Sequence, residues 1–394
     1  MDLNAVLAHA VELGASDIHL KAGQPPVVRR DGELGLLPDH PALFDSDLES
    51  ALALVADLSP AKLSVFHETG ELDVAYATEG LPRFRVNGFR QRGSISFAFR
   101  VIPSKVPSFE ELRLPQGVRR LAEEHRGLVL CTGATGSGKT TTLATVIDHI
   151  NRTRRQHIVT IEDPIEILHS DQGCIVNQRE VGLDTDSFLA AIRRVLRQDP
   201  DVILIGELRD AETAETALKA AESGHLVFST MHTIDAGETI SRMIEFFPAV
   251  KQDQIRSILA GVLRGVISQR LLPRKEGTGR VAAVEVMLNN ARISDLIREQ
   301  KTEEITDAIA EGQFFDMQTF TQALIELVLA GDVDREVAAN ASTNRHDFLV
   351  ELEQALKRQA AGVETDRPVS EMEPEEVEPG EQPMPGLRLA GQDG

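Results

Sequence analysis

The residues best suited to do chemistry form one short stretch, GATGSGKTTT, which begins at Gly133. Glycines at three positions let the backbone turn tightly and aim its N–H groups inward, and a following helix adds partial positive charge. Lys139 is placed to reach the β- and γ-phosphates of a nucleotide, and the Thr140 hydroxyl is suited to ligate Mg²⁺. The predicted nucleotide-binding residues are Gly133, Ala134, Thr135, Gly136, Ser137, Gly138, Lys139, Thr140 and Thr141.

A carboxylate should complete such a site. The stretch DVILIGELRD is an apolar strand that ends at Gly206 and Glu207. Glu207 at this place can hold Mg²⁺, through a water molecule, or polarise the attacking water. The alternative is a solvent-exposed glutamate after a core strand. The loop upstream favours the functional interpretation.

Three further carboxylates follow the apolar run HIVTI, namely Glu162, Asp163 and Glu166. Carboxyl ends of parallel strands are where α/β sheets bind ligands, so one of these groups could be a general base for water. We favour Glu166 over Glu162. The alternative is an acidic turn that caps a helix, which Asp163 before Pro164 would suit.

Two histidines flank the apolar run LVFSTM, His225 before it and His232 after it. A single histidine on a strand is more often structural, but a pair in a nucleotide-binding sheet points to catalysis. His232 is predicted to contact the γ-phosphate, with His225 a second catalytic candidate. Metal ligation is not expected, because no ligand-spaced cysteines or histidines accompany them.

Arginines cluster in the first hundred residues despite the acidity of the chain. Arg83 and Arg85 share one face of an expected strand. The cluster is either a solvated sheet face or a source of arginine fingers that reach a nucleotide, on a neighbouring subunit for instance. Its members are Arg83, Arg85, Arg90, Arg92 and Arg100.

The elements that must position these residues alternate between buried strands and helices from Gln116 onward. Apolar runs at 127–131, 157–161, 201–205 and 225–232 read as strands of a parallel sheet with covering helices. Helical spacing after the loop predicts a helix with Leu143 and Ile150 on its buried face. Apolar residues from Ile255 to Ile267 predict another amphipathic helix, with more helices to about Arg358.

The residues before this region alternate polar and apolar and predict a small α+β domain, with a turn at Asp31 and Gly32. The expected organisation is a first domain at 1–102, a linker at 103–115, a nucleotide-binding domain at 116–358 and a tail at 359–394. The tail is rich in Glu and Pro, so it cannot bury enough surface to fold and is expected to be disordered.

Composition limits the partners. The 394-residue chain carries a formal net charge of −21, which argues against nucleic acid as a partner. Its two cysteines, Cys131 and Cys174, make neither a disulfide framework nor a four-cysteine zinc site. We find no signal peptide and no apolar span, so we expect a protein that works in the cytoplasm.

Several stretches together resemble the secretion and pilus motor ATPases, specifically the PilT-like type IV pilus retraction ATPases. They include ASDIHL, RFRVNGFRQRG, TIEDPIE, LRQDPDVILIGELRD, SGHLVFSTMHT and ISQRLLP. The resemblance implies a PAS-like first domain, a RecA-like ATPase domain with a helical C-terminal part, and a homohexameric ring that hydrolyses ATP with Mg²⁺. It also implies contact with a pilus platform protein at the inner membrane. By this resemblance Arg85 and Arg100 match γ-phosphate contacts, Glu166 the water-activating position, and His225 and His232 the histidine box.

Other functions stay open at this point. The related extension and secretion motors typically have an extra amino-terminal domain and a four-cysteine motif, which favours retraction for this chain. The family's signature AIRNLIRE is replaced by a stretch in which Arg292 to Asp295 read RISD, so an accessory retraction paralogue is an alternative. The remaining alternatives are a secretion or extension ATPase, a nucleic-acid translocase, and a regulator that binds ATP without hydrolysing it.

Overall fold

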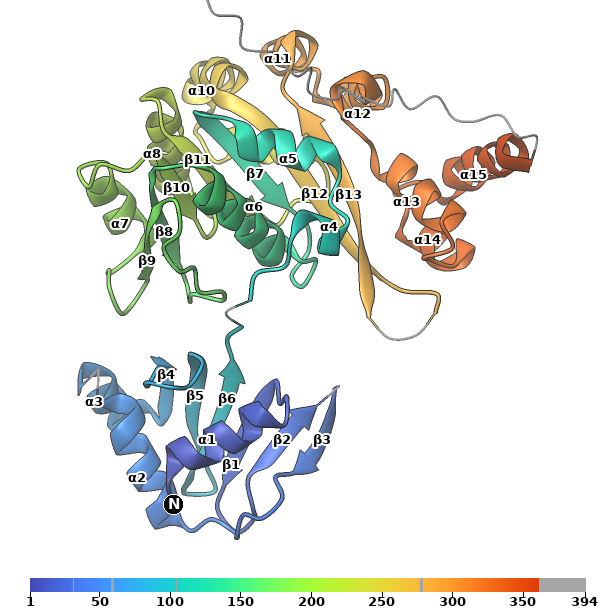
Figure 1. The fold of residues 1–394 in the computed structure, drawn as a ribbon. Coiled ribbons are helices and arrows are strands. Elements are labelled where there is room, and N and C mark those ends of the chain that lie inside the picture. Colours follow the sequence, from blue (N-terminus) through green and yellow to red (C-terminus); the bar gives the residue numbers. More distant parts are fainter. Residues whose placement is uncertain (31, 58–59, 104, 277–278, 361–394) are drawn as a thin grey trace, which may run out of the picture.

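The chain folds into a smaller domain and a larger one, joined by the segment that follows Val101 (Figure 1). This computed structural model describes residues 1–30, 32–57, 60–103, 105–276 and 279–360. The predicted fold class, an α/β protein with a small α+β first domain, is confirmed. The predicted tail lies outside the described residues from 361 onward, as does Asp31 of the predicted turn.

The first domain is an antiparallel sheet in the order β3-β2-β1-β6-β5-β4 with helices on one face. Apolar side chains alternate along the central strands and meet the apolar face of α1, so the core includes Leu7, Ile18 and Phe99. The second helix was not predicted. The strands are β1 Asp17–Lys21, β2 Val27–Arg30, β3 Glu33–Leu36, β4 Glu71–Tyr76, β5 Phe84–Gln91 and β6 Ser94–Val101, and the helices are α1 Leu3–Glu12, α2 Asp45–Ala56 and α3 Pro60–Thr69.

The larger domain is built on a seven-stranded sheet in the order β13-β12-β7-β11-β10-β8-β9. Its strands pair in parallel except for β13, which pairs antiparallel with β12. The central strands are fully buried, as expected for a sheet covered on both faces. The strands are β7 Gly127–Thr132, β8 His157–Glu162, β9 Ile175–Glu180, β10 Val202–Ile205, β11 Leu226–Met231, β12 Leu263–Pro273 and β13 Arg280–Leu288.

Helices cover both faces of this sheet. One core lies under α5 and α6 and contains Leu143 and Ile150 as predicted, and the other lies under α7 to α10. The predicted linker contains the short helix α4. These helices are α4 Phe109–Leu112, α5 Gln116–Glu123, α6 Lys139–Thr153, α7 Phe188–Val195, α8 Ala211–Glu222, α9 Ala236–Glu245 and α10 Ala249–Val262.

The C-terminal helices lie beyond β12 and β13 (Figure 1). The last three pack together over Leu272, Val281 and Ala283 of these two strands. This part comprises α11 Ala291–Arg298, η1 Thr302–Glu304, α12 Ile305–Ala310, η2 Gln313–Phe315, α13 Phe320–Leu329, α14 Arg335–Ala341 and α15 Arg345–Ala360.

The expectation of one helix from Ile255 to Ile267 is wrong. The helix α10 ends at Val262, and the following residues form β12, in which Val266 pairs with Leu130 of β7. A strand buried on both faces is apolar at nearly every position, so it also satisfies helical spacing. Only glycine fits at position 265, because a Cβ there would meet the Met287 carbonyl oxygen at 2.4 Å. The prediction of helices alone after this point also missed β13.

Candidate nucleotide-binding site

The glycine-rich loop lies between the carboxyl end of β7 and the start of α6. Gly133, Gly136 and Gly138 have φ values of +139°, +79° and +93°, which favour glycine. At Gly133 a Cβ would also meet the Gln269 carbonyl oxygen at 2.4 Å. Because the 15-residue helix α6 begins directly after it, the loop presents backbone N–H groups and a positive helix end to an anion.

Lys139 is the first residue of α6 and is almost fully buried. Its Nζ donates to the carbonyl oxygens of Gly133 at 2.7 Å and Ala134 at 3.0 Å, so the ammonium group lies within the loop. Burial lowers the pKa of Lys139, and the charges of Glu207 and Glu166 act in the opposite direction. The charges of both predicted carboxylates therefore act on the loop lysine.

Glu207 is held in place by the strands on each side of β10. The Gly206 N–H donates to the Ile161 carbonyl of β8 at 2.8 Å, and the Gly206 carbonyl accepts from Thr230 Oγ1 of β11 at 2.6 Å. The Glu207 side chain is only 13% exposed. One of its oxygens pairs with Arg209, which the sequence analysis did not single out.

His232 follows β11 and lies beside this carboxylate. Its Nε2 is 3.5 Å from Glu207 Oε2, and its side chain is half exposed. A histidine in this position can meet a group that binds at the loop. His232 and Glu207 thus form one pair, and the charge of its carboxylate acts on Lys139.

His225 lies at the other end of β11, because the six-residue strand separates the two histidines. Its Nδ1 is 3.0 Å from the Ala220 carbonyl and 3.0 Å from Ser223 Oγ, at the end of α8. Six strand residues span roughly 20 Å. Within this chain, His225 is therefore not brought together with the loop, and its contacts are those of a residue that holds the end of a helix.

The two candidate general bases in the acidic segment at the end of β8, Glu162 and Glu166, differ in their surroundings. Glu162 is buried and its Oε1 accepts from Thr160 Oγ1 at 2.7 Å and Gln178 Nε2 at 3.0 Å. Burial raises the pKa of Glu162. Glu166 is exposed and affects the Lys139 ammonium, which favours it as the group that could activate water. Asp163 caps no helix, since residues 163–174 form none, so that alternative is wrong.

Arg85 and Arg100 lie directly opposite each other on β5 and β6. Each is balanced by an aspartate of the same domain: Arg85 Nε lies 4.0 Å from Asp73 Oδ1, and Arg100 Nε lies 2.9 Å from Asp17 Oδ1. Both side chains are open to solvent, at 46% and 69% exposure. They therefore stand on an open face of the first domain rather than in the loop's own surroundings.

Arg83 joins the two domains. Its guanidinium pairs with Glu180 at the end of β9, and both side chains are largely buried. The same carboxylate accepts from the backbone N–H of Ile165 at 3.3 Å, next to Glu166. Arg83 belongs to the cluster predicted as either a solvated sheet face or a source of arginine fingers. Its partner was not predicted, because the two residues are 97 positions apart.

Residues of β12 pack under the glycine-rich loop and form its floor. This strand was not predicted from the sequence. Ser268 Oγ accepts from Thr132 Oγ1 at 3.0 Å, and Gln269 Nε2 donates to Thr142 Oγ1 at 2.9 Å. The sulfhydryl of Cys131 donates to Gln269 Oε1 at 3.4 Å. Burial raises the pKa of Cys131 to about 12, so this cysteine is a structural thiol under the loop.

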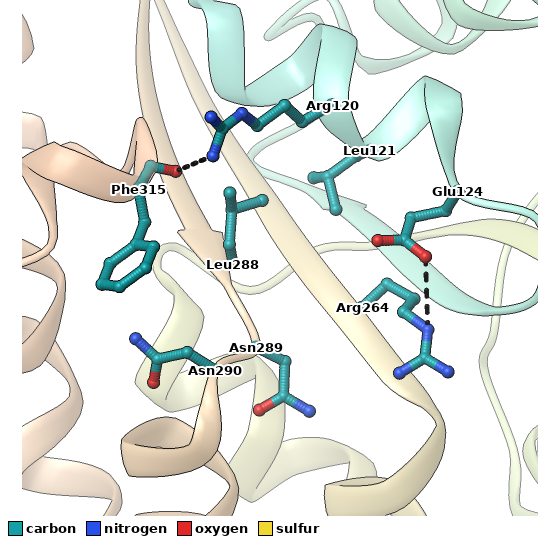
Figure 2. Close-up of a pocket in the computed structure, with 8 residues that line it drawn as sticks. All are labelled: Arg120, Leu121, Glu124, Arg264, Leu288, Asn289, Asn290 and Phe315. Carbon is teal, nitrogen blue, oxygen red and sulfur yellow. Dashed lines mark hydrogen bonds and ion pairs between the residues drawn. The ribbon is translucent and has the colours of Figure 1, made fainter.

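A separate pocket of about 270 Å³ opens at the opposite end of the sheet (Figure 2). It lies where β12 begins and β13 ends, so it is not part of the loop site. The pocket is lined by Arg120, Leu121, Glu124, Arg264, Leu288, Asn289, Asn290 and Phe315.

Within the ranges that the structure describes, no group of three His, Cys, Asp or Glu residues could hold a metal ion. The described helices also include none that is long and apolar enough to cross a membrane.

Comparison with known proteins agrees with this geometry. Residues 106–360 match the family described as type II/IV secretion system protein. The chain is 46% identical to the type IV pilus retraction ATPase PilT of Pseudomonas aeruginosa over 349 residues, which are 88% of this chain and 100% of that protein. It is 40% identical to the type IV pilus ATPase PilU of the same organism over 88% of this chain and 90% of the relative. A crystal structure of the pilus retraction motor PilT with bound ADP matches with a TM-score of 0.82 and 45% identity, over 88% of this chain and 98% of that one.

Proposed function

This chain belongs to the type II/IV secretion system protein family, and from that premise we propose that it is the ATP-hydrolysing motor of type IV pilus retraction. It is an ATPase, and the nucleotide binds at the loop that begins at Gly133. The observation that carries the proposal is the high identity to a pilus retraction ATPase along that relative's entire length. The proposal includes a ring of six subunits and a place in the cytoplasm, at the membrane-embedded pilus machine.

The loop and Lys139 bind the phosphates of ATP in this proposal. The Lys139 ammonium lies within the loop, where it donates to the Gly133 carbonyl, and the charges of Glu207 and Glu166 act on it. Gly133 to Gly138, with Thr140 and Thr141 at the start of α6, surround the β- and γ-phosphates.

Glu207 and Thr140 fit Mg²⁺, because a carboxylate and a hydroxyl beside the loop lysine are the oxygen ligands that this ion takes with nucleotides. When bound, Mg²⁺ would neutralise charge that develops on the transferred phosphoryl group. Glu166 then accepts a proton from the attacking water, since its carboxylate is exposed and near Lys139. His232 contacts the γ-phosphate from its position beside Glu207.

Arg85 and Arg100 reach the nucleotide of a neighbouring subunit in this arrangement. Their own carboxylate partners lie within the first domain, and their side chains are exposed. Binding of ATP would draw the first domain and the ATPase domain together, and hydrolysis would release them. ATP can drive this movement only by binding the closed arrangement more tightly than the open one. A platform protein at the inner membrane would receive this movement. His225 has no role in the proposed site.

The experiment that tests the function measures Mg²⁺-dependent ATP hydrolysis by the purified full-length chain. The Lys139→Ala variant should lose turnover and keep its fold, because the Lys139 ammonium donates to carbonyl oxygens of its own loop. Surplus pili without twitching in a deletion strain would support retraction, whereas loss of all pili would indicate an extension motor. Stimulation of hydrolysis by DNA would point to a translocase instead.

An accessory retraction ATPase is the second candidate, and one observation favours it. The exposed start of α11 carries Arg292 and Asp295 in place of the residues usual in this signature. A deletion strain that still twitches under low load, and stops only when a second retraction ATPase is removed, would identify the accessory role.

A further inference from the structure

Glu285 is a buried carboxylate in the middle of β13. Its side chain is 3% exposed, and its neighbours Val284 and Val286 are also buried. An ionisable group in such a place is unfavourable unless hydrogen bonds compensate it. The partners of Glu285 should therefore reveal what the carboxylate does.

Two helix starts interact with this carboxylate. The backbone N–H of Ala236, the first residue of α9, donates to Glu285 Oε1 at 2.9 Å. The backbone N–H of Phe320, the first residue of α13, also acts on this carboxylate and lowers its pKa. Each helix also has its own N-cap, Asp235 for α9 and Thr319 for α13. In addition to these two N-caps, Glu285 interacts with the first turns of both helices, which are far apart in sequence.

The two helices belong to different parts of the domain. The helix α9 begins four residues after His232, which lies beside Glu207. The helix α13 opens the C-terminal bundle, which packs on β12 and β13. Glu285 therefore lies between the loop that carries His232 and the helices at the far edge of the sheet.

Arg270 strengthens the same junction from β12. Its guanidinium stacks over the Phe320 ring at 4.0 Å, and its Nη2 donates to Thr343 Oγ1 at 3.0 Å. It also donates to the Ala341 carbonyl at the end of α14. The charge of Arg270 acts on the Glu285 carboxylate. Glu285 and Arg270 together connect α9 to the first and second helices of the bundle.

We propose that Glu285 is a positioning residue that ties the first turn of α9 to the first turn of α13, so that movement of the His232 loop is passed to the C-terminal helices. The proposal rests on the proposed function, since it is nucleotide binding that moves the loop. Glu207, whose charge acts on Lys139, lies beside His232, and α9 begins four residues after this histidine. Because the carboxylate accepts a hydrogen bond from α9 and also interacts with the first N–H of α13, a shift of α9 would change the position of a group that acts on α13.

The test compares wild type with Glu285→Gln, which keeps the size of the side chain but offers only one oxygen acceptor. Hydrogen–deuterium exchange of the full-length protein is measured with Mg²⁺ and either ADP or a non-hydrolysable ATP analogue. In wild type, exchanging ADP for the analogue should slow exchange at 232–238 and at 319–323. In the Gln variant, the response at 232–238 should remain while the response at 319–323 disappears.

Thr319→Ala is the matched control, because Thr319 Oγ1 accepts from the Gln322 N–H and caps α13 through a bond within that helix. It should speed exchange in α13 by about twofold to tenfold through loss of one hydrogen bond, yet keep the nucleotide response. The Gln variant should also lower kcat with little change in KM, which a merely structural defect in α13 would not do.

Two results would overturn the inference: no nucleotide response at 319–323 in wild type, or an unchanged response in the Gln variant. If the Gln variant does not fold, Glu285→Asp, which keeps the charge but shortens the reach, takes its place with the same expected loss. Failure of the proposed function would look different, since wild type would then neither bind nor hydrolyse ATP.

Discussion

Nη2 of Arg83 lies 2.7 Å from Oε2 of Glu180, and this pair joins the first domain to the edge of the ATPase sheet. The Glu180 carboxylate also accepts from the Ile165 N–H, so the pair fixes the segment that carries Glu166. The interface between the domains therefore reaches directly into the predicted water-activating segment.

Arg83→Ala should destabilise the protein by about 3 kcal/mol, because it leaves a buried carboxylate without its cation. ATP turnover should fall as well, since the segment beside Glu166 loses its anchor. Thermal unfolding and steady-state hydrolysis check both effects. Lys219→Ala, which removes an exposed pair with Glu215, should leave the melting temperature and turnover unchanged. Equal behaviour of the two variants would show that the Arg83 pair has no special role.

Glu207→Gln should bind ATP but hydrolyse it at least about a hundredfold more slowly, because general base or ion-polarising groups contribute this much. Glu166→Gln should show a similar loss of kcat. Glu162→Gln should retain most of the activity, since Glu162 is bonded to Thr160 and Gln178. Nucleotide binding and single-turnover hydrolysis separate the effects. If Glu162→Gln abolished turnover and Glu166→Gln did not, Glu162 would be the group that activates water in place of Glu166.

The two histidines should behave differently. His232→Ala should lower kcat because it removes the group beside Glu207. His225→Ala should leave turnover intact and alter only local stability at the end of α8, where its contacts lie. Steady-state kinetics of both variants, with circular dichroism as a check on folding, makes the comparison. A dead His225 variant with an intact fold would mean that His225 acts on a neighbouring subunit's site.

The stability of the fold should depend on pH through Glu285. Burial raises its pKa to about 7 and Asp235 adds to the rise, while the N–H groups of Ala236 and Phe320 and the charge of Arg270 lower it. The folded state thus binds this proton more tightly than the unfolded chain, in which a glutamate carboxyl has its ordinary pKa of 4.5. The stabilisation is complete below about pH 4.5 and is lost as pH rises through 7.

The difference in the free energy of unfolding between wild type and Glu285→Gln should decline by about 3 kcal/mol as the pH rises from about 4.5 through 7. Denaturant titrations at pH 5, 6, 7 and 8 provide the values. Taking the difference between the two proteins removes the contributions of all other titrating groups. A constant difference would mean that the carboxyl titrates at its ordinary pKa.

Local patterns in the sequence predicted much of the site, and long-range pairing explains what they missed. The loop at Gly133 and the strand before Glu207 could be predicted because glycine spacing and apolar runs act within a few residues. The partners Gln269 and Glu180 could not, since each contact joins distant strands. The strand β12 was mistaken for helix because its buried residues satisfy both periods. A signal for Glu285 was present, as it is the one charged residue within VAAVEVML.

The floor of the loop has a consequence for how the chain is made. Thr132 and its partner Ser268 are 136 positions apart, so the glycine-rich loop leaves the ribosome long before β12 does. At roughly 5 to 20 residues per second, this gap lasts about 7 to 27 s. During that interval the nascent chain exposes β7 as an unpaired, apolar edge, and chaperones have a defined target until the hairpin of β12 and β13 closes over it.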